Sequence, residues 1–484
     1  MLIPFTIAAA VGALALGAYL TNPFNRFTII RRPYIAKMTD GVIKAIDGNR
    51  RLVINQTALY RVFAVVKNGI HILNSRWHNS PASSAKTVEG IMRDIYDLRF
   101  DPNKLLLTSG DHFSALFVRN LGVFYYPTLD TALHCDEKRW ENRQIVYLQT
   151  LAYALGTFDK LPELKTTIVP TGRYHATGVN FHAYPSDTMY GMLYALAALL
   201  GKATARPYHY ATPIHALDTI PAAELLYKTY RDSLAQHYWN YRAYAYDETT
   251  GLISATALMS GAKDITKRQC AFYDNVVFWK TTELAMQLGL LKTDKKFLTD
   301  LKTRILDAFW LQNEGYFLED LSPEGLAGNY YSSDWLIALA TGFISPADAA
   351  EREYFTRSVE YIRTMKIDEP FPIKYQHETR ANRQFFIVRL AVAAYGGDSI
   401  WSFWGIEYIK VLMALHKETG EATYLKLADK HIKTYKQNML KNSGFPEVYD
   451  KDGALLETPL YRSIRQTGWV VGFDQVLAIR GSLK

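Results

Sequence analysis

Cysteine is nearly absent from this chain of 484 residues, which holds only Cys135 and Cys270. The two lie far apart in the sequence and match no metal or redox spacing, and nothing in the sequence supports a disulfide between them. HExxH, clustered Cys and His, and a phosphate-cradling glycine loop are also missing. We therefore predict no metal and no cofactor, and neither a metal enzyme nor a nucleotide enzyme is indicated.

Acidic residues are scarce at one end of the chain. Residues 1–100 hold thirteen Lys and Arg against five Asp and Glu, an excess equal to the whole chain's net charge of +8. Residues 101–484 are balanced, with 42 charges of each sign. A nucleic-acid footprint needs a basic face on the main domain, so this distribution argues against DNA or RNA as a partner.

An uncharged apolar run opens the chain, from Leu2 to Leu20. It is about as long as one helix across a bilayer, and no basic side chain precedes it, so we predict an uncleaved transmembrane anchor within residues 1–22. A cleaved secretory signal is the alternative. The basic residues that follow predict a cytoplasmic main domain and attraction to anionic lipid headgroups: Arg26, Arg31, Arg32 and Lys37.

Two regions follow the predicted anchor. Residues 23–84 form a basic lead-in segment, whose short apolar runs and Gly and Asn turns are typical of strands and a hairpin, or of short helices. The Ser- and Pro-bearing stretch 80–84 is the predicted linker. Residues 85–484 form the main domain, which is long and apolar enough to bury a large core.

Helical patterning dominates residues 85–484, with Leu, Ala, Phe, Trp and Tyr at three- and four-residue spacing. A polar loop leads into an apolar helix in six places, at intervals of about sixty to seventy residues. These are residues 109–125, 183–201, 260–289, 328–343, 396–415 and 442–477. Six helical hairpins close most simply into a double ring, so we predict an all-α fold, an (α/α)6 toroid.

The last of these stretches sets Glu447 behind a Gly-Phe-Pro turn and ahead of a Trp-bearing apolar helix. It contains Phe445-Pro446-Glu447, Asp450, Gly453, Pro459-Leu460 and Ser463. This pattern resembles the segment that carries the catalytic base of glucoamylase-type glycosidases. Val448 replaces the usual Gln, and Tyr461-Arg462 replaces the usual Thr-Trp. Those departures leave the base in place and bear on linkage and substrate preference.

The resemblance extends over residues 105–480 to the six-hairpin glycosidases, which include glucoamylases, trehalases and debranching-type glucosidases. It implies functional residues on the loops at one end of the ring. Arg119-Asn120 stands where that group has an Arg-Asp pair for the innermost sugar, and Asn120 retains hydrogen bonding without the charge. We call the six loop-and-helix stretches rims and number them in chain order. The second rim is matched by Ser186-Asp187, and the fifth by Gly397, Trp401 and Trp404.

Glycosidic cleavage requires an acid for the leaving oxygen and a carboxylate that activates water or attacks the sugar. The resemblance places the acid on the third rim, where Asp264, followed by Arg268, is the first candidate. Asp274 is the second candidate, although a helix N-cap would also explain it. If Asp264 and Glu447 act by inversion, their carboxyl groups lie roughly 6.5–9.5 Å apart, whereas about 5 Å would indicate retention.

Other loop residues are predicted to bind the sugar. Asp187, Asp274 and Asp334 either cap helices or accept hydrogen bonds from hydroxyls. Aromatic rings at such loops either stack on pyranose faces or belong to the core. The aromatic candidates are Tyr125, Tyr184, Tyr331, Trp335, Trp401 and Trp404, and the candidate histidines are His112 and His182.

Together these features predict a membrane-anchored glycoside hydrolase that acts on an α-glucoside or related oligosaccharide, with Asp264 as acid and Glu447 as base. A glycan-binding protein that kept the fold and lost catalysis is one alternative, and Asn120 is its best support. A membrane-associated transferase or phosphorylase using the same cleft is the other.

Overall fold

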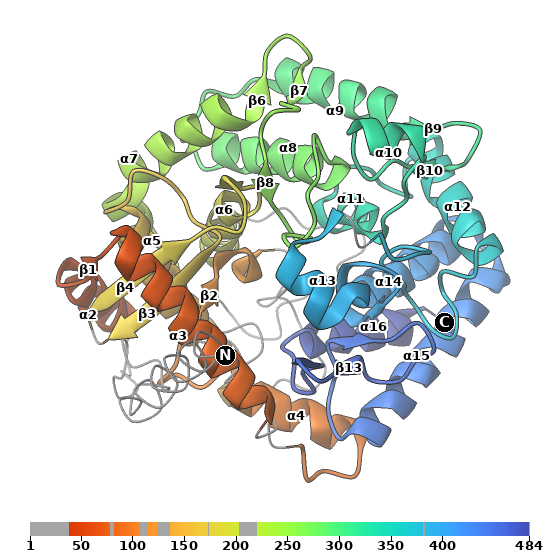
Figure 1. Cartoon of the computed structure of the whole chain (residues 1–484), viewed down its shortest axis with the longest axis horizontal. Helices are drawn as coiled ribbons and strands as arrows, with labels where there is room; N and C mark the ends of the chain where they lie inside the picture. The colour runs from red at the N-terminus through yellow and green to blue at the C-terminus, as the bar shows by residue number, and fades with distance from the viewer. Residues whose placement is uncertain are drawn as a thin grey trace, which may run out of the picture.

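The computed structural model describes residues 38–77, 82–106, 115–122, 136–172, 174–202, 220–380 and 383–483. In this part of the chain, helices form two concentric rings (Figure 1). The inner helices are α6 (Thr188–Leu199), α8 (Phe272–Gln287), α11 (Ile337–Thr341), α14 (Ser402–Thr419) and α16 (Val470–Ser482). The outer helices are α4 (Val88–Arg99), α5 (Glu137–Phe158), α7 (Ile220–Ala245), α9 (Lys295–Phe309), α12 (Ala349–Thr364) and α15 (Ala422–Asn442).

The two rings differ in the pattern of their apolar residues. The inner helix α14 is buried without a break from Ser402 to Leu415, because it has neighbours on every side. The outer helix α9 buries only Leu301, Ile305 and Phe309, which share one face at four-residue spacing. Inner and outer helices alternate along the chain, which confirms the predicted hairpin rhythm.

Five of the predicted rims are described from end to end, and each leads into an inner helix. Residues 183–201 lead into α6, 260–289 into α8, 328–343 into α11, 396–415 into α14 and 442–477 into α16. In the first rim, 109–125, the described part contains the 3₁₀ helix η2 (Val118–Leu121), which packs on α6.

The lead-in segment packs against the rings. It forms α2 (Met38–Arg50) and α3 (Ala58–Trp77), and α2 covers the outer side of α5, which explains why α5 is buried on nearly all sides. The Asn49 amide donates to the Ala152 carbonyl at 2.6 Å. At the end of α2, Lys160 Nζ donates to the carbonyl oxygens of Asn49 and Leu52 at 2.7 and 2.6 Å.

A four-stranded sheet departs from the all-α prediction. Its order is β1 (Val53–Ile54), β4 (His175–Val179), β3 (Thr167–Gly172) and β2 (Leu116–Phe117). β1 is parallel to β4, and the other pairs are antiparallel. β1 and β4 are some 120 residues apart, with Val53 opposite His175, so local patterning does not reveal the pairing.

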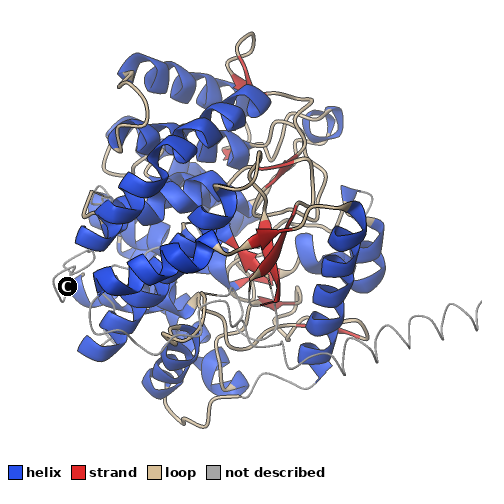
Figure 2. Ribbon diagram, turned by 90° about the vertical axis from the view of Figure 1, so that its left-hand side faces the viewer, coloured by secondary structure: helices blue, strands red, loops and turns tan. Residues whose placement is uncertain are grey.

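Short strands also join neighbouring rims. β5 (Tyr184–Pro185) pairs in parallel with β8 (Met259–Ser260), and β11 (Ile400–Trp401) pairs antiparallel with β12 (Val448–Tyr449). Most strands lie near the middle of the view in Figure 2, with helices on both sides of them. The remaining strands are β6 (Tyr246–Asp247), β7 (Leu252–Ile253), β9 (Trp310–Leu311), β10 (Tyr316–Phe317), β13 (Glu457–Thr458) and β14 (Tyr461–Arg462), and the remaining helices are α10 (Pro323–Ala327), α13 (Phe386–Val392), η3 (Ser333–Leu336) and η5 (Ala393–Gly396).

Several predictions fall outside the described residues. They concern the Leu2–Leu20 anchor with its flanking basic residues, His112, Tyr125 and Cys135. Within the described ranges, no helix has the length and apolar character needed to cross a bilayer. Cys270 is buried and carries a free thiol.

Candidate active site

A pocket at the rim side of the rings brings Asp264 and Glu447 together. Its empty volume is about 560 Å³, open mouth included. The third rim contributes Ala262 to Ile265, the fifth contributes Trp401, and Glu447 comes from the last rim. The other lining residues are Phe117, Arg119, Asn120, Tyr375, Tyr395, Gly396 and Trp469.

Backbone pairing holds Glu447 at the pocket wall. Its N–H donates to the Ile464 carbonyl at 2.8 Å, and its carbonyl accepts from the Ser402 N–H at 3.1 Å. Glu447 directly precedes β12, which pairs with β11 of the fifth rim. The residue is only 3% exposed, so its carboxylate belongs to the pocket lining and does not face bulk solvent.

Two phenol groups orient the Glu447 carboxylate. The Tyr395 hydroxyl donates to Oε1 at 3.3 Å, and the Tyr461 hydroxyl donates to Oε2 at 3.1 Å. Each carboxylate oxygen therefore has a donor from a different loop, which limits rotation of the side chain. Tyr461 is one of the residues at which the sequence departs from the glucoamylase-type pattern.

Asp264 lies in a turn after β8, and Arg119 reaches it from η2. Arg119 donates from Nη2 to Asp264 Oδ2 at 2.6 Å and from Nη1 to the Gly261 carbonyl. The Arg119 Nε lies 3.5 Å from Asp187 Oδ1. One guanidinium thus links the first, second and third rims.

Burial dominates the protonation of Asp264. It raises the pKa of this carboxyl above its ordinary value, although the charge and hydrogen bond of Arg119 act in the opposite direction. The side chain remains 14% exposed. Asp264 therefore combines access to the pocket with a raised pKa, the two properties that a general acid needs.

Aromatic rings form a wall beside Glu447. Trp401 contacts Tyr395 at 4.6 Å, Tyr375 at 5.6 Å and Trp469 at 6.0 Å between ring centroids. The Trp401 indole N–H donates to the Tyr395 carbonyl at 2.7 Å, which fixes the ring. Flat, fixed rings of this kind suit a sugar face.

Three predicted sugar-binding carboxylates lie behind the lining. Asp187 accepts a hydrogen bond from the Tyr273 hydroxyl at 3.0 Å, and burial raises its pKa to about 6 against the charge of Arg119. Asp334 accepts from Arg268 at 2.6 Å, and burial raises its pKa. Burial likewise raises the pKa of Asp274.

Neither Asp274 nor Asp187 caps a helix with its side chain. Helix α8 begins at Phe272 with Ala271 as its N-cap, so Asp274 stands inside the first turn. Asp187 occupies the N-cap position of α6, but its side chain makes no capping hydrogen bond. It is committed instead to Tyr273 and Arg119.

Of the aromatic candidates that the structure describes, only Trp401 lines the pocket. Trp335 and Trp404 are each 1% exposed and pack in the core, as do Tyr184 and Tyr331. The Trp335 ring contacts Phe317 and Phe355, and Trp404 contacts Tyr273 and Tyr375. The His182 ring contacts Phe385 in a tilted arrangement with 4.9 Å between ring centroids, and burial lowers the pKa of His182.

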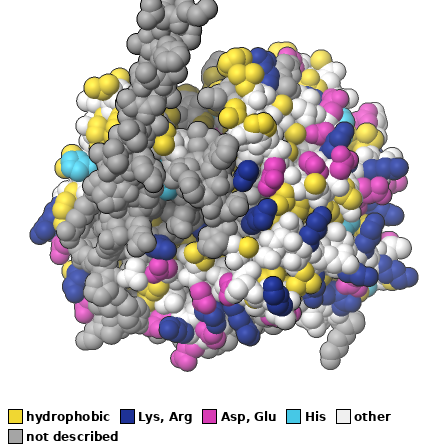
Figure 3. Space-filling view, turned by 60° about the horizontal axis from the view of Figure 1, so that its bottom comes forward, with side chains coloured by type: hydrophobic (Ala, Val, Ile, Leu, Met, Phe, Trp, Pro, Cys, Tyr) yellow, Lys and Arg dark blue, Asp and Glu magenta, His cyan; other side chains and the backbone are white. Residues whose placement is uncertain are grey.

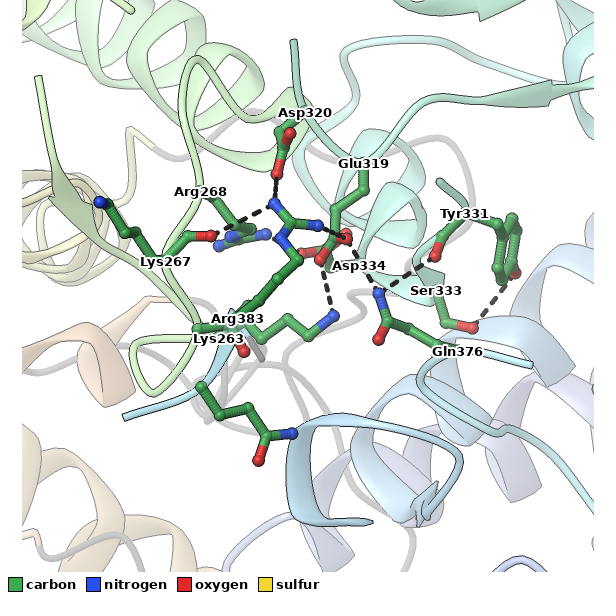
Figure 4. A network of polar contacts seen from close by, with 12 residues as sticks. Lys263, Lys267, Arg268, Glu319, Asp320, Tyr331, Ser333, Asp334, Gln376 and Arg383 are labelled. Carbon is green, nitrogen blue, oxygen red and sulfur yellow. Dashed lines mark hydrogen bonds and ion pairs between the residues drawn. The ribbon is translucent and has the colours of Figure 1, made fainter. Parts of the chain in front are cut away.

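A buried network of charges includes Lys263, the residue before Asp264 in the sequence (Figure 4). Lys263, which lines the pocket, donates to Glu319 Oε1 at 2.6 Å. Glu319 Oε2 accepts from Gln376 and from Arg383, both at 2.9 Å, and Arg383 also contacts Asp320. Burial acts to raise the pKa of Glu319, but the charges of Lys263 and Arg383 outweigh it and lower that pKa to about 2.

Sequence reasoning missed this network and eight of the thirteen lining residues. Lys263 was visible only as the neighbour of Asp264, and Glu319, Gln376 and Arg383 belong to no motif. Tyr395 stands just before the Gly397 motif of the fifth rim, and Trp469 stands in the last rim. Their proximity to matched motifs was the one local signal that could have identified them.

Comparison with known proteins bears on the fold. No family model matches the chain, and neither does any curated protein. A rhamnosidase from Klebsiella oxytoca with rhamnose bound superposes with a TM-score of 0.50 at 13% identity, over 83% of this chain and 66% of the rhamnosidase, just under two thirds of its length. A family 15 glucoamylase from Hypocrea jecorina superposes with a TM-score of 0.48 at 12% identity, over 81% of this chain and 71% of that one. A D-mannose isomerase gives a TM-score of 0.49 at 9% identity, over 84% of this chain and 100% of that one. At such identities a likeness shows the fold alone, and the fold of this chain is that of the six-hairpin glycosidases.

Proposed function

We propose that this protein is a glycoside hydrolase whose catalytic groups are Asp264 and Glu447. One observation carries the proposal: two carboxyl side chains from rims some 180 residues apart line one pocket. Glycosidic cleavage requires a pair of carboxyl groups that can both reach the scissile bond. Asp274 is the weaker candidate for the acid, because it lies behind the lining.

In the proposed mechanism, protonated Asp264 gives its proton to the leaving oxygen. Glu447 takes a proton from a water molecule as that water attacks the anomeric carbon from the opposite face, so the anomeric configuration inverts. The raised pKa of Asp264 supports its role as acid. The two phenol donors on Glu447 support its role as an oriented base.

The proposed substrate is an α-glucoside or a related oligosaccharide. Arg119, Asn120 and Trp401 would contact the sugar directly, since they line the pocket. Asp187, Asp274, Asp334, Trp335 and Trp404 would act from behind by holding that lining in place. The phenol and indole groups around Trp401 are better suited to contact a pyranose ring than to bind a charged ligand.

Substitution of the two carboxyl residues tests the proposal. Asp264→Asn should abolish turnover of oligosaccharides but preserve turnover of aryl glycosides whose leaving group needs no proton. Glu447→Gln should abolish both activities. Glu457→Gln is the matched control, because Glu457 is a partly exposed carboxylate on β13, outside the pocket lining.

Anomer-resolved product analysis on a panel of α- and β-linked oligosaccharides gives both linkage and stereochemistry. A product of inverted configuration is expected, and a retained one would overturn the inverting mechanism. Sugar binding without hydrolysis by the unaltered chain would support the inactive glycan-binding alternative. Turnover that depends on phosphate or on an activated sugar donor would support the transferase or phosphorylase alternative.

We also propose that Leu2–Leu20 anchors the chain in a membrane with the catalytic domain on the cytoplasmic side. The uncharged run and the basic residues after it support this topology. Retention in the membrane fraction after carbonate washing, with an intact N-terminus by mass spectrometry, is the expected result. A mature chain that begins after residue 20 would overturn it in favour of a cleaved signal.

A further inference from the structure

Helix α3 carries an apolar stripe on its outer surface. Leu59 and Phe63 are four residues apart, as are Val62 and Val66, so these side chains share one face of the helix. Leu59 is 82% exposed, and the others are 43–61% exposed. Val65, at 49%, widens the stripe.

The opposite face of α3 is the one that belongs to the fold. Ala64 is fully buried, the Tyr60 hydroxyl lies 2.6 Å from Thr171 Oγ1, and Lys67 Nζ donates to the Thr171 carbonyl at 3.4 Å. The helix thus rests on β3 and β4 by its polar and small side chains. A contiguous apolar surface facing outward on a folded protein usually marks an interaction site.

The charge of the sequence that contains α3 favours one kind of partner: Arg61 is exposed on the helix, and Lys67 lies on its inner side. From Gly48 to Val88 the sequence has no Asp or Glu, whereas it has six Lys and Arg, at positions 50, 51, 61, 67, 76 and 86. Elsewhere the signs mix, as on the right and lower part of the face in Figure 3, where Lys, Arg, Asp and Glu intermingle. An apolar stripe with basic residues and no acidic ones is the pattern of a helix that lies on an anionic bilayer.

The chain also keeps α3 within reach of a bilayer. Leu2–Leu20 precedes α2 by 17 residues, which span at most about 60 Å when fully extended. We propose that α3 lies in the interface of an anionic lipid bilayer, with Leu59, Val62, Phe63 and Val66 inserted below the headgroups. This inference does not depend on the hydrolase assignment.

Site-specific photocrosslinking can identify what covers the stripe. A benzophenone amino acid would replace Phe63 in the full-length chain, which is then reconstituted into phosphatidylcholine vesicles containing phosphatidylglycerol. The same replacement at Leu326 of α10, which is 49% exposed, is the matched control. Both positions face outward, so the bulky side chain leaves the core intact.

We expect lipid adducts at position 63 and only background at position 326. We also expect fewer adducts at position 63 when the vesicles lack phosphatidylglycerol, and an equal yield would overturn the anionic preference. Crosslinks from position 63 to residues 1–37, or to a second copy of the chain, would overturn the proposal by identifying a protein as the cover. Flotation of the chain with vesicles tests the N-terminal anchor. Flotation without lipid adducts at position 63 would overturn the α3 proposal while still supporting the anchor.

Discussion

Glu447 and Asp264 share a pocket but have opposite kinds of partner. Glu447 receives two neutral phenol donors, whereas Asp264 receives a guanidinium. Phenols orient a carboxylate without neutralising it, which suits a base that must take a proton from water. A guanidinium opposes protonation of its partner, so burial has to outweigh Arg119 for Asp264 to keep its proton.

Removing one phenol from Glu447 should lower the rate more than the affinity. In Tyr461→Phe, Oε2 loses its donor at 3.1 Å. A hydrogen bond to a charged group contributes about 1.5–3 kcal/mol, so we expect kcat to fall about ten- to a hundredfold with KM little changed. Tyr449→Phe, on β12, is the control and should leave kcat near the wild-type value. A change in KM alone would contradict a positioning role for Tyr461.

Arg119→Met should move the pH profile of the reaction. Burial then raises the pKa of Asp264 with less opposition, since the guanidinium that lowered it is gone. An acid acts below its pKa, so the basic limb of kcat/KM should shift to higher pH. Arg242→Met, at an ion pair with Glu248 outside the pocket lining, should leave the limb in place. A shift to lower pH would contradict the assignment of Asp264 as acid.

At the scale of elements, the rims could be predicted because their signal is local. A polar loop followed by a helix that is apolar on every side marks an inner helix, and the resemblance to glucoamylase-type glycosidases pointed to Asp264 and Glu447 within such loops. The pairing of β1 with β4 could not be predicted, because the two strands lie some 120 residues apart. The network of Lys263, Glu319 and Arg383 was missed for the same reason: each residue alone looks like an ordinary charged loop position.

Close packing between α6 and η2 places Arg119. A Cβ atom on Gly191 of α6 would lie 2.6 Å from the Val118 carbonyl oxygen and 3.2 Å from Arg119 Cα. Gly191→Ala should therefore separate the two elements, destabilise the protein by about 1–3 kcal/mol and reduce activity. Urea denaturation measures the stability change.

Gly481→Ala is the matched control on α16. Nothing lies within 4 Å of a Cβ atom there. This variant should be neutral or up to about 1 kcal/mol more stable, because alanine favours a helix over glycine. Equal destabilisation by both substitutions would contradict the packing argument.

At the scale of the whole molecule, buried charges connect loops of different hairpins. Lys263 belongs to the third rim, Glu319 follows β10, and Gln376 and Arg383 lie between α12 and α13. Such a network is stable only while all its members are paired, since an unpaired buried charge is costly. Through Lys263, which lines the pocket, the network links the pocket wall to loops of other hairpins.

Acid should unfold the protein in part through Glu319. Its pKa is about 2 in the folded state against an ordinary 4.5. Between these values the unfolded chain binds a proton that the folded chain does not, so stability falls as the pH is lowered through this window. The full shift corresponds to about 3 kcal/mol.

Urea midpoints measured across that window should fall steadily for the wild type. Glu319→Gln should start from a lower stability and show a flatter dependence on pH, because it lacks the titrating group. The difference between the two curves isolates Glu319 from other carboxyl groups, such as Asp187, whose raised pKa acts in the opposite sense. Parallel curves would contradict the role of the network.

Helix α2 has a practical consequence for anyone preparing this protein. It covers α5, and Lys160 binds its last carbonyl groups, so a truncated chain that starts at residue 85 would leave a bare apolar wall and should precipitate. A chain that starts at Met38 keeps this cover and should remain monodisperse by gel filtration. Expression trials should therefore cut ahead of α2 and nowhere later.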